Sequence, residues 1–223
     1  MATSPAQTWA LFIASSDEHL LQEITERQNG KVNRYLIHTV NVVAGKLPGG
    51  LAPDWSVVRF EKDDPIRFAD ESHPALKASL ITFRGMTQNL HYTTVAQSQE
   101  LEARSRAEFE PSNETIAVLI PIGKSLEWWQ LAQDKRQAHF QISGGYQGHT
   151  AIGIRYVDRV FRKLYHSRYT DPLAPYDFLT YFEFNSAHKG DFNALLDELR
   201  DTSRNPEWAH VELEYEIWMT KIG

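Results

Sequence analysis

The 223-residue sequence contains no cysteine. A chain without thiols cannot form disulfides or hold iron–sulfur clusters, and it cannot bind a cofactor through a thiolate. Any metal or prosthetic group must therefore be held by other side chains. Nine histidines are present, so composition alone does not select a ligand.

The sequence also lacks an excess of basic residues. It contains 23 lysines and arginines and 29 acidic residues, so the net charge is -6. No basic stripe interrupts this balance, which argues against a nucleic acid or an anionic membrane as partner. No apolar run approaches the ~20 residues needed to cross a bilayer. The first residues, "MATSPAQTWALFIASSDE", lack a basic leader and are not typical of a signal peptide. We therefore expect a cytoplasmic protein.

Short apolar segments alternate with helical patterns along the chain, which predicts an α+β protein. The expected strands are 9–14, 35–44, 55–60, 76–84, 115–122, about 160–168, 178–184 and 210–219. The expected helices are 18–27, 94 to about 108, one or more over 125 to about 146 with an interruption near Gly144 and Gly145, and 187–200. Thr94 and Gln97 form a capping box at the start of the second helix.

The order of these elements in the second half is β-α-β-β-α-β, which is typical of a ferredoxin-like unit. The first half fits a similar order, and the polar segment 109–113, which contains a proline, separates the two. We therefore expect two ferredoxin-like halves of the dimeric α+β barrel type, residues 1–110 and 111–223. The first half is expected to be degenerate and to serve assembly, and the second to carry the functional site.

The stretch from Thr115 to Glu183 concentrates the residues that suggest chemistry. The apolar run "IAVLIPI", residues 116–122, precedes two adjacent tryptophans in "GKSLEWWQL", residues 123–131. A histidine then follows a glycine-rich break, and a dense group of arginines follows the histidine. A flat, apolar, anionic cofactor needs such a combination of aromatic, apolar and cationic side chains.

Several segments in this order resemble the chlorite dismutase family of haem b proteins, most closely its short-chain branch. They are "IPIGKSLEWWQL", "GHTAIG", "RKLYHS", "YDFLTYFEF" and "PEWAHVE". Nearer the N-terminus only "RGMTQNLHY", residues 84–92, is similar. The resemblance implies a ferredoxin-like fold, a non-covalently bound haem b, and the conversion of chlorite into chloride and dioxygen.

The resemblance also implies roles for three residues at the iron. His149, in "GHTAIG", is the expected proximal ligand, although a histidine at such a position is by itself more often a surface or capping residue. Glu207, in "PEW", is expected to accept the other ring N–H of that histidine and so to increase its electron donation to iron. Arg162 is the expected catalytic residue, because a permanently charged guanidinium can hold chlorite and the transient hypochlorite. By position alone Arg162 is more typical of a surface arginine on a strand, and His166 competes with His149 as a ligand.

Further side chains are expected to line the cofactor, with the lysine and the tyrosine near its propionates. These are Ile120, Ile122, Lys124, Trp128, Trp129 and Tyr92. Without the resemblance, the tryptophan pair is more typical of core aromatics than of a cofactor site.

Three other functions remain open at the level of sequence. The first is coproheme decarboxylation, the haem-biosynthetic activity of the family's other large branch; Arg162 argues against it, because those relatives carry a neutral residue there. The second is haem binding or sensing with weak peroxidase activity. The third is a structural α+β dimer without a cofactor. A homo-oligomer is expected in each case, and the short-chain motifs favour a dimer over the pentamer of the long-chain branch.

Overall fold

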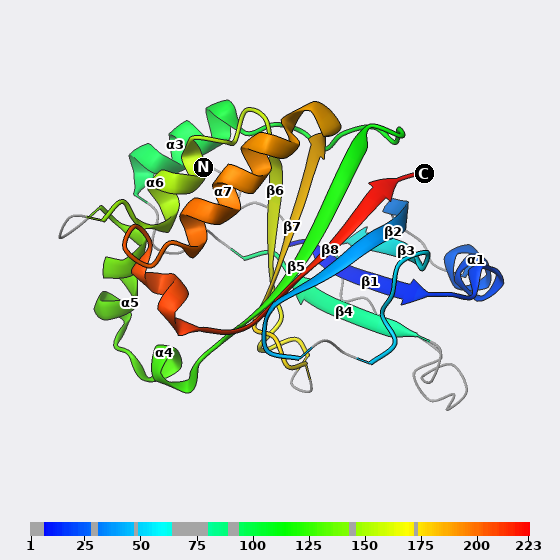
Figure 1. Cartoon of the computed structure of the whole chain (residues 1–223), viewed down its shortest axis with the longest axis horizontal. Helices are drawn as coiled ribbons and strands as arrows, with labels where there is room; N and C mark the ends of the chain where they lie inside the picture. Colours follow the sequence, from blue (N-terminus) through cyan, green and yellow to red (C-terminus); the bar gives the residue numbers. More distant parts are fainter. Residues whose placement is uncertain are drawn as a thin grey trace.

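The computed structural model describes residues 7–27, 31–46, 49–63, 80–88, 94–142, 146–171 and 174–223. Its strands are β1 (Trp9–Ser15), β2 (Lys31–Ala44), β3 (Ser56–Lys62), β4 (Ile81–Met86), β5 (Thr115–Lys124), β6 (Phe161–His166), β7 (Phe178–Asn185) and β8 (Val211–Lys221). These strands close into one antiparallel barrel in the order β1-β3-β2-β8-β5-β7-β6-β4 (Figure 1). The predicted α+β class is confirmed.

The strand order is the same in both parts of the chain. The second half contributes β8-β5-β7-β6 and the first half β4-β1-β3-β2. The two sets join along β2 and β8, where Tyr35 lies opposite Lys221, and along β4 and β6, where Met86 lies opposite His166. One continuous sheet therefore runs through both halves, and their separation into units 1–110 and 111–223 stays a prediction.

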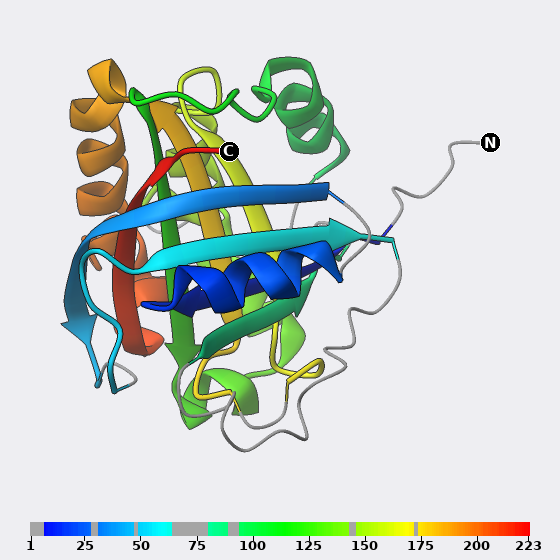
Figure 2. The same ribbon diagram turned by 90° about the vertical axis from the view of Figure 1, so that its right-hand side faces the viewer.

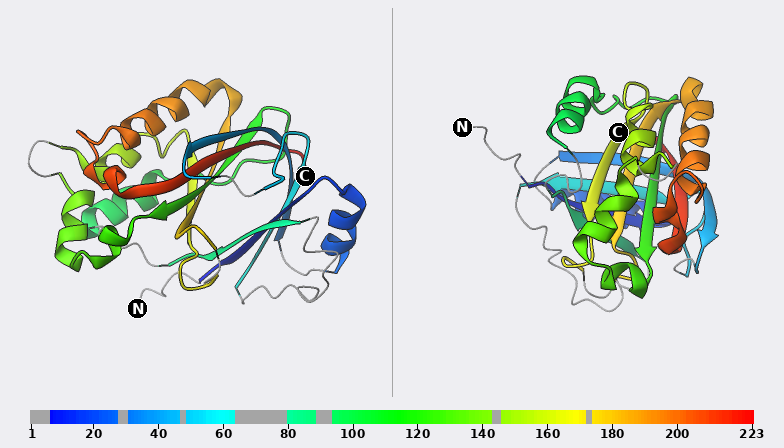
Figure 3. Two further views of the ribbon diagram at one scale, coloured as in Figure 1. Left: turned by 60° about the horizontal axis from the view of Figure 1, so that its bottom comes forward. Right: turned by 90° about the vertical axis from the view of Figure 1, so that its left-hand side faces the viewer.

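Helices cover the outside of this barrel. They are α1 (Glu18–Glu26), α3 (Val95–Arg104), α4 (Leu126–Gln130), α5 (Gln133–Phe140), α6 (Gly148–Ile154) and α7 (Lys189–Arg200), with 3-10 turns η1 (Ser186–His188) and η2 (Pro206–His210). The second-half helices lie over the strands of their own half in the right-hand view of Figure 3, whereas α1 lies across the first-half strands in Figure 2. In the part of the chain that the structure describes, no helix is long and apolar enough to span a bilayer.

Hydrogen bonds at the helix ends explain several boundaries. The Asp17 side chain accepts from the Leu20 N–H and begins α1. The predicted capping box of Thr94 and Gln97 is confirmed at α3. Such caps satisfy backbone N–H groups that have no partner inside the helix.

One helix end was predicted wrongly, because the helix from 94 ends at Arg104 rather than near 108. The helix or helices predicted over 125 to about 146 are the two short helices α4 and α5, and the chain leaves helical geometry between them at Leu131 and Ala132. The interruption predicted near Gly144 and Gly145 lies outside the described residues. The helix α6 was not predicted, since seven residues that include two glycines give almost no periodic signal.

Successive side chains of each strand point to opposite faces of the sheet, so an inner core lies inside the barrel and two outer cores lie outside it. Inward side chains such as Phe12, Tyr165 and Tyr181 fill the barrel. Outward side chains of β5 and β7, such as Val118 and Phe182, pack against α6 and α7. Outward side chains of β1 and β3 pack against α1 in a separate apolar cluster. Among the described candidates, Ile120, Ile122, His149 and Arg162 lie together on the outer face of the second half.

Candidate active site

His149 and Glu207 meet although they are 58 residues apart in the sequence. His149 is the second residue of α6, and Glu207 lies in η2, which Pro206 begins. Gly148 places α6 close to the end of α5: its φ is +75°, and a Cβ there would lie 2.8 Å from the Phe140 backbone. The glycine before the histidine is therefore needed for the turn itself.

The Nδ1 atom of His149 lies 2.9 Å from Oε2 of Glu207. The other oxygen of this carboxylate, Oε1, lies 2.8 Å from Nζ of Lys124, whose side chain is 2% exposed. Burial alone raises the pKa of Glu207, but the charges of Lys124 and His149 outweigh it and hold that pKa well below its usual range. Glu207 is therefore ionised and can only accept hydrogen bonds.

The charge of Glu207 fixes the tautomer of His149. Because the carboxylate cannot donate, Nδ1 carries a hydrogen, and in the neutral form of the ring the lone pair would lie on Nε2. That Nε2 lies 3.4 Å from Nη2 of Arg162, a guanidinium nitrogen that can only donate. The structure therefore orients a basic imidazole nitrogen away from the carboxylate and towards Arg162, on β6.

A small cavity of about 20 Å³ opens in front of this nitrogen. Its walls come from β5, β6, β7, α7, η2 and β8, and they are mainly apolar. The lining residues are Ile120, Ile122, His149, Arg162, Thr180, Phe182, Leu196, Leu199, Trp208 and Glu214. The structure thus brings the predicted Ile120 and Ile122 to the same place as His149 and Arg162.

Lys124 has a partner that the sequence did not predict. Its buried ammonium binds Glu207. It also lies 4.9 Å from the Trp128 ring and 5.3 Å from the Trp208 ring. Lys124 is therefore bound to the carboxylate that orients His149, and its expected contact with a cofactor propionate stays a prediction.

The two adjacent tryptophans lie in separate surroundings, outside the cavity lining. Trp128 is 3% exposed and packs against the rings of His139 and His210. Trp129 stacks on Phe178, and its Nε1 donates to Asp177 at 3.2 Å. Both contacts agree with the core interpretation of this pair.

Of two further candidates, only His166 lies within the described residues. Tyr92 lies outside the described residues. His166 packs edge-on against Phe178, with 5.2 Å between the ring centroids, and it does not line the cavity beside His149. Of the two histidines, His149 lines the cavity and His166 does not, and the assignment of His149 as a ligand stays a prediction.

Sequence reasoning missed Trp208, Leu196 and Leu199 as part of the site. Trp208 follows Glu207 directly, and its ring centroid is 6.4 Å from that of His149. Its Nε1 donates to Glu214 at 3.0 Å. The segment "PEWAHVE" contained the signal, because a residue beside a candidate carboxylate on a short turn shares its surroundings.

Taken together, the barrel and the site define an α+β protein with a carboxylate-oriented histidine that faces an apolar cavity on the outside of the sheet. A family model described as chlorite dismutase matches residues 68–220. The chain belongs to the chlorite dismutase family, as the resemblance implied.

Individual relatives agree with this assignment. The chain is 32% identical over 122 residues to the chlorite dismutase of Ideonella dechloratans, a match that covers 54% of this chain but 39% of that protein. It resembles the dimeric chlorite dismutase of Nitrobacter winogradskyi at 26% identity and a TM-score of 0.65, covering 94% and 99% of the two chains. A mutant chlorite dismutase of Candidatus Nitrospira defluvii has the same fold, with 21% identity, a TM-score of 0.67 and coverage of 99% and 93%.

Proposed function

We propose that this chain is a haem b-dependent chlorite dismutase that converts chlorite into chloride and dioxygen. The observation that carries the proposal is the orientation of His149. Its Nδ1 is bound to the ionised Glu207, while its Nε2 faces an apolar cavity beside Arg162. A neutral imidazole whose other nitrogen binds a carboxylate is the kind of donor that holds haem iron.

The residues present fit haem in their chemistry. Because Nδ1 faces Glu207, Nε2 is the nitrogen that would bind iron, and the walls around it are apolar, as a macrocycle requires. The space has to widen, because Nη2 of Arg162 lies 3.4 Å from Nε2. Arg162 is exposed, and its guanidinium would have to move away from Nε2 when haem binds.

Three side chains would then act together on the histidine. His149 would hold the iron through Nε2, and Glu207 would fix the ring and increase its electron donation. Lys124 would keep Glu207 ionised and in place, since the pair is buried and each partner neutralises the other. The iron of a bound haem would supply the chemistry that takes an oxygen atom from chlorite and returns it to form the O–O bond.

Arg162 would act on the anions rather than on the metal. Its charge is permanent, so it can bind chlorite on arrival and retain the hypochlorite formed from it without acting as a base. The electrostatic attraction between this charge and an anion is stronger beside an apolar wall than in bulk water. Loss of Arg162 would therefore release hypochlorite, which would attack the protein.

Assembly belongs to the same proposal. The Nitrobacter winogradskyi chlorite dismutase is dimeric, and it is matched over nearly its whole length. We therefore propose a homodimer, with the second half of each chain holding one haem and the first half serving assembly. A cytoplasmic location is part of this proposal as well.

An oxygen electrode tests the proposed reaction directly. Chlorite is added to haem-loaded wild type and to the variants Arg162→Ala and His149→Ala. Rapid oxygen release is expected from wild type, loss of it without His149, and slower, self-inactivating release without Arg162. If haem-loaded wild type releases no oxygen, the dismutase proposal is wrong, and turnover of coproheme becomes the next assay.

A further inference from the structure

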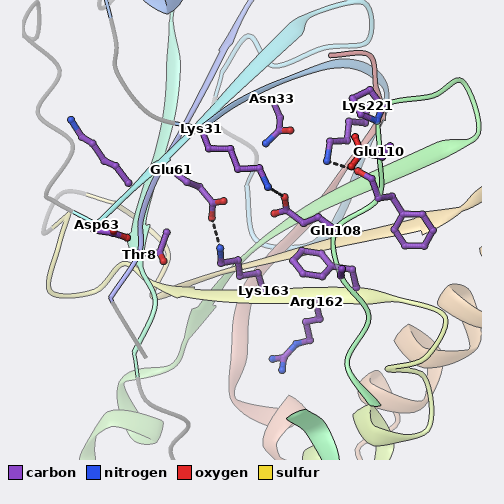
Figure 4. A pocket seen from close by; sticks show the side chains of 15 residues that line it. Thr8, Lys31, Asn33, Glu61, Asp63, Glu108, Glu110, Arg162, Lys163 and Lys221 are labelled. Atoms are coloured by element: carbon purple, nitrogen blue, oxygen red, sulfur yellow. Dashed lines mark hydrogen bonds and ion pairs between the residues drawn. The ribbon is translucent and has the colours of Figure 1, made fainter. Parts of the chain in front are cut away.

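A second, larger cavity opens at one end of the barrel. Its volume is about 800 Å³, within the range of small-molecule sites. The walls come from β1, β2, β3, β6 and β8 and from the connector between the halves, residues 107–111 (Figure 4). It lies on the inner side of β6, whereas His149 lies on the outer side.

The lining of this cavity is rich in charged side chains. Five are cationic and four are carboxylates: Lys31, Lys62, Arg162, Lys163 and Lys221, and Glu61, Asp63, Glu108 and Glu110. Arg162 points away from the others (Figure 4), so the remaining four cations balance the four carboxylates. An anion would therefore be held by hydrogen-bond donors rather than by an excess of positive charge.

The charges at the floor are fixed by a buried network. Arg59 is completely buried and lies 2.6 Å from Glu61, and it also binds Glu108. Burial alone raises the pKa of Glu108, but Arg59 and Lys31 lower it to about 2. Both carboxylates therefore stay ionised, and they hold the ammonium groups of Lys163 and Lys31 at the cavity.

Each of these lysines keeps spare hydrogen-bond donors. Lys163 Nζ binds the Glu61 carboxylate at 2.7 Å, and Lys31 Nζ binds the Glu108 carboxylate. An ammonium carries three N–H groups. In Figure 4 both pairs meet inside the cavity, and Arg162 points away from them.

An unpaired amide points to a ligand at the same place. Asn33 lines the cavity and is only 6% exposed, yet its Nδ2 has no hydrogen-bond partner among the residues that the structure describes. Asn33 shares the inward face of β2 with Tyr35, which is fully buried in the barrel. Buried side-chain donors are normally paired, so this amide calls for an acceptor in the cavity.

We propose that the barrel mouth is an anion site, in which Asn33 Nδ2 and the ammonium groups of Lys163 and Lys31 bind a small monovalent anion with two acceptor oxygens. Carboxylates share this chemistry with bent inorganic oxyanions such as nitrite and chlorite. This anion site does not depend on whether the chain is a chlorite dismutase. Because Arg162 lines both cavities, an anion held here lies next to the strand that carries the candidate catalytic residue.

Calorimetric titration of the full-length chain with nitrite, at constant ionic strength, tests the site, and acetate serves as the carboxylate arm. One saturable binding event is expected. It should weaken about tenfold or more in Asn33→Asp, which adds a charge, and in Lys163→Met, because bonds to charged groups are lost. Lys135→Met, an exposed α5 lysine with the same change in net charge, should bind as wild type does. The stronger of the two anions identifies the ligand class.

Two outcomes overturn the proposal. If neither anion binds saturably, or if Asn33→Asp binds as wild type does, the cavity holds only water. If nitrite binding disappears in His149→Ala, it belongs to the iron site. Oxygen release from chlorite is measured separately, so the anion site can fail while the dismutase proposal stands, and the reverse.

Discussion

The two outer faces of the barrel have the same strand order but different contents. On β1 and β3 the outward side chains Leu11, Ile13, Val58 and Phe60 pack against α1 in an apolar cluster. On β5 and β7 the outward side chains pack against α6 and α7, and His149, Arg162 and Glu207 lie among or beside them. The first face is held to its helix by an apolar cluster, whereas the second combines apolar packing with oriented charges.

The difference arises in the connections rather than in the strands. A single helix, α1, links β1 to β2, but α4, α5 and α6 link β5 to β6, and α6 carries His149. The turn η2, between α7 and β8, adds Glu207. The candidate site is thus built from connections and short helices on a sheet, which is where binding and catalytic residues are commonly found.

The largest expected effect comes from Glu207→Ala. Removing the carboxylate leaves the Lys124 ammonium buried and unpaired, so the free energy of unfolding should fall by about 3–5 kcal/mol. Urea denaturation followed by tryptophan fluorescence measures it. The double variant Lys124→Met/Glu207→Leu is the control and should regain most of the stability. A single variant as stable as wild type would show that Lys124 does not need this partner.

A substitution in the first half should affect stability alone. Leu21, on α1, is fully buried, so Leu21→Ala should cost about 2–5 kcal/mol while oxygen release per folded molecule stays unchanged. Leu196→Ala on α7 is the matched variant, because Leu196 lines the candidate site. It should lower haem affinity as well. Equal effects of both variants on haem affinity would remove the distinction between the two faces.

The pH dependence of the folding stability should report on the charged network at Glu108 rather than on either outer face. The pKa of Glu108 is lowered from 4.5 to about 2 in the folded chain. Its contribution to stability is therefore complete above 4.5 and is lost as the pH falls from there towards 2. Urea midpoints measured across this window should fall less steeply in Glu108→Gln than in wild type. Parallel curves would mean that Glu108 has an ordinary pKa.

The smallest effect is expected for Arg155→Ala. Arg155 pairs with Glu198 and so links α6 to α7, but its side chain is 44% exposed. Exposed pairs contribute about 0–1 kcal/mol, so thermal unfolding should shift little and haem affinity should stay near that of wild type. A large loss of haem affinity would show that this surface pair positions His149.

Sequence patterns predicted most strands because alternation and β-branched residues mark them locally. Barrel closure was not predictable in that way, since the pairing of β2 with β8 joins residues nearly the whole chain apart. His149, Glu207 and Arg162 were identified by their segments, whereas the partner of Lys124 was not. A lysine's partner depends on the path of a distant turn, and no spacing in the sequence encodes that path.

The most direct test of the central claim is a haem titration followed by the Soret band, on wild type, His149→Ala and the control His166→Ala. The account predicts saturation at one haem per chain for wild type and for His166→Ala, and loss of tight binding for His149→Ala. Equal, tight binding by His149→Ala would contradict it, because another residue would then hold the iron.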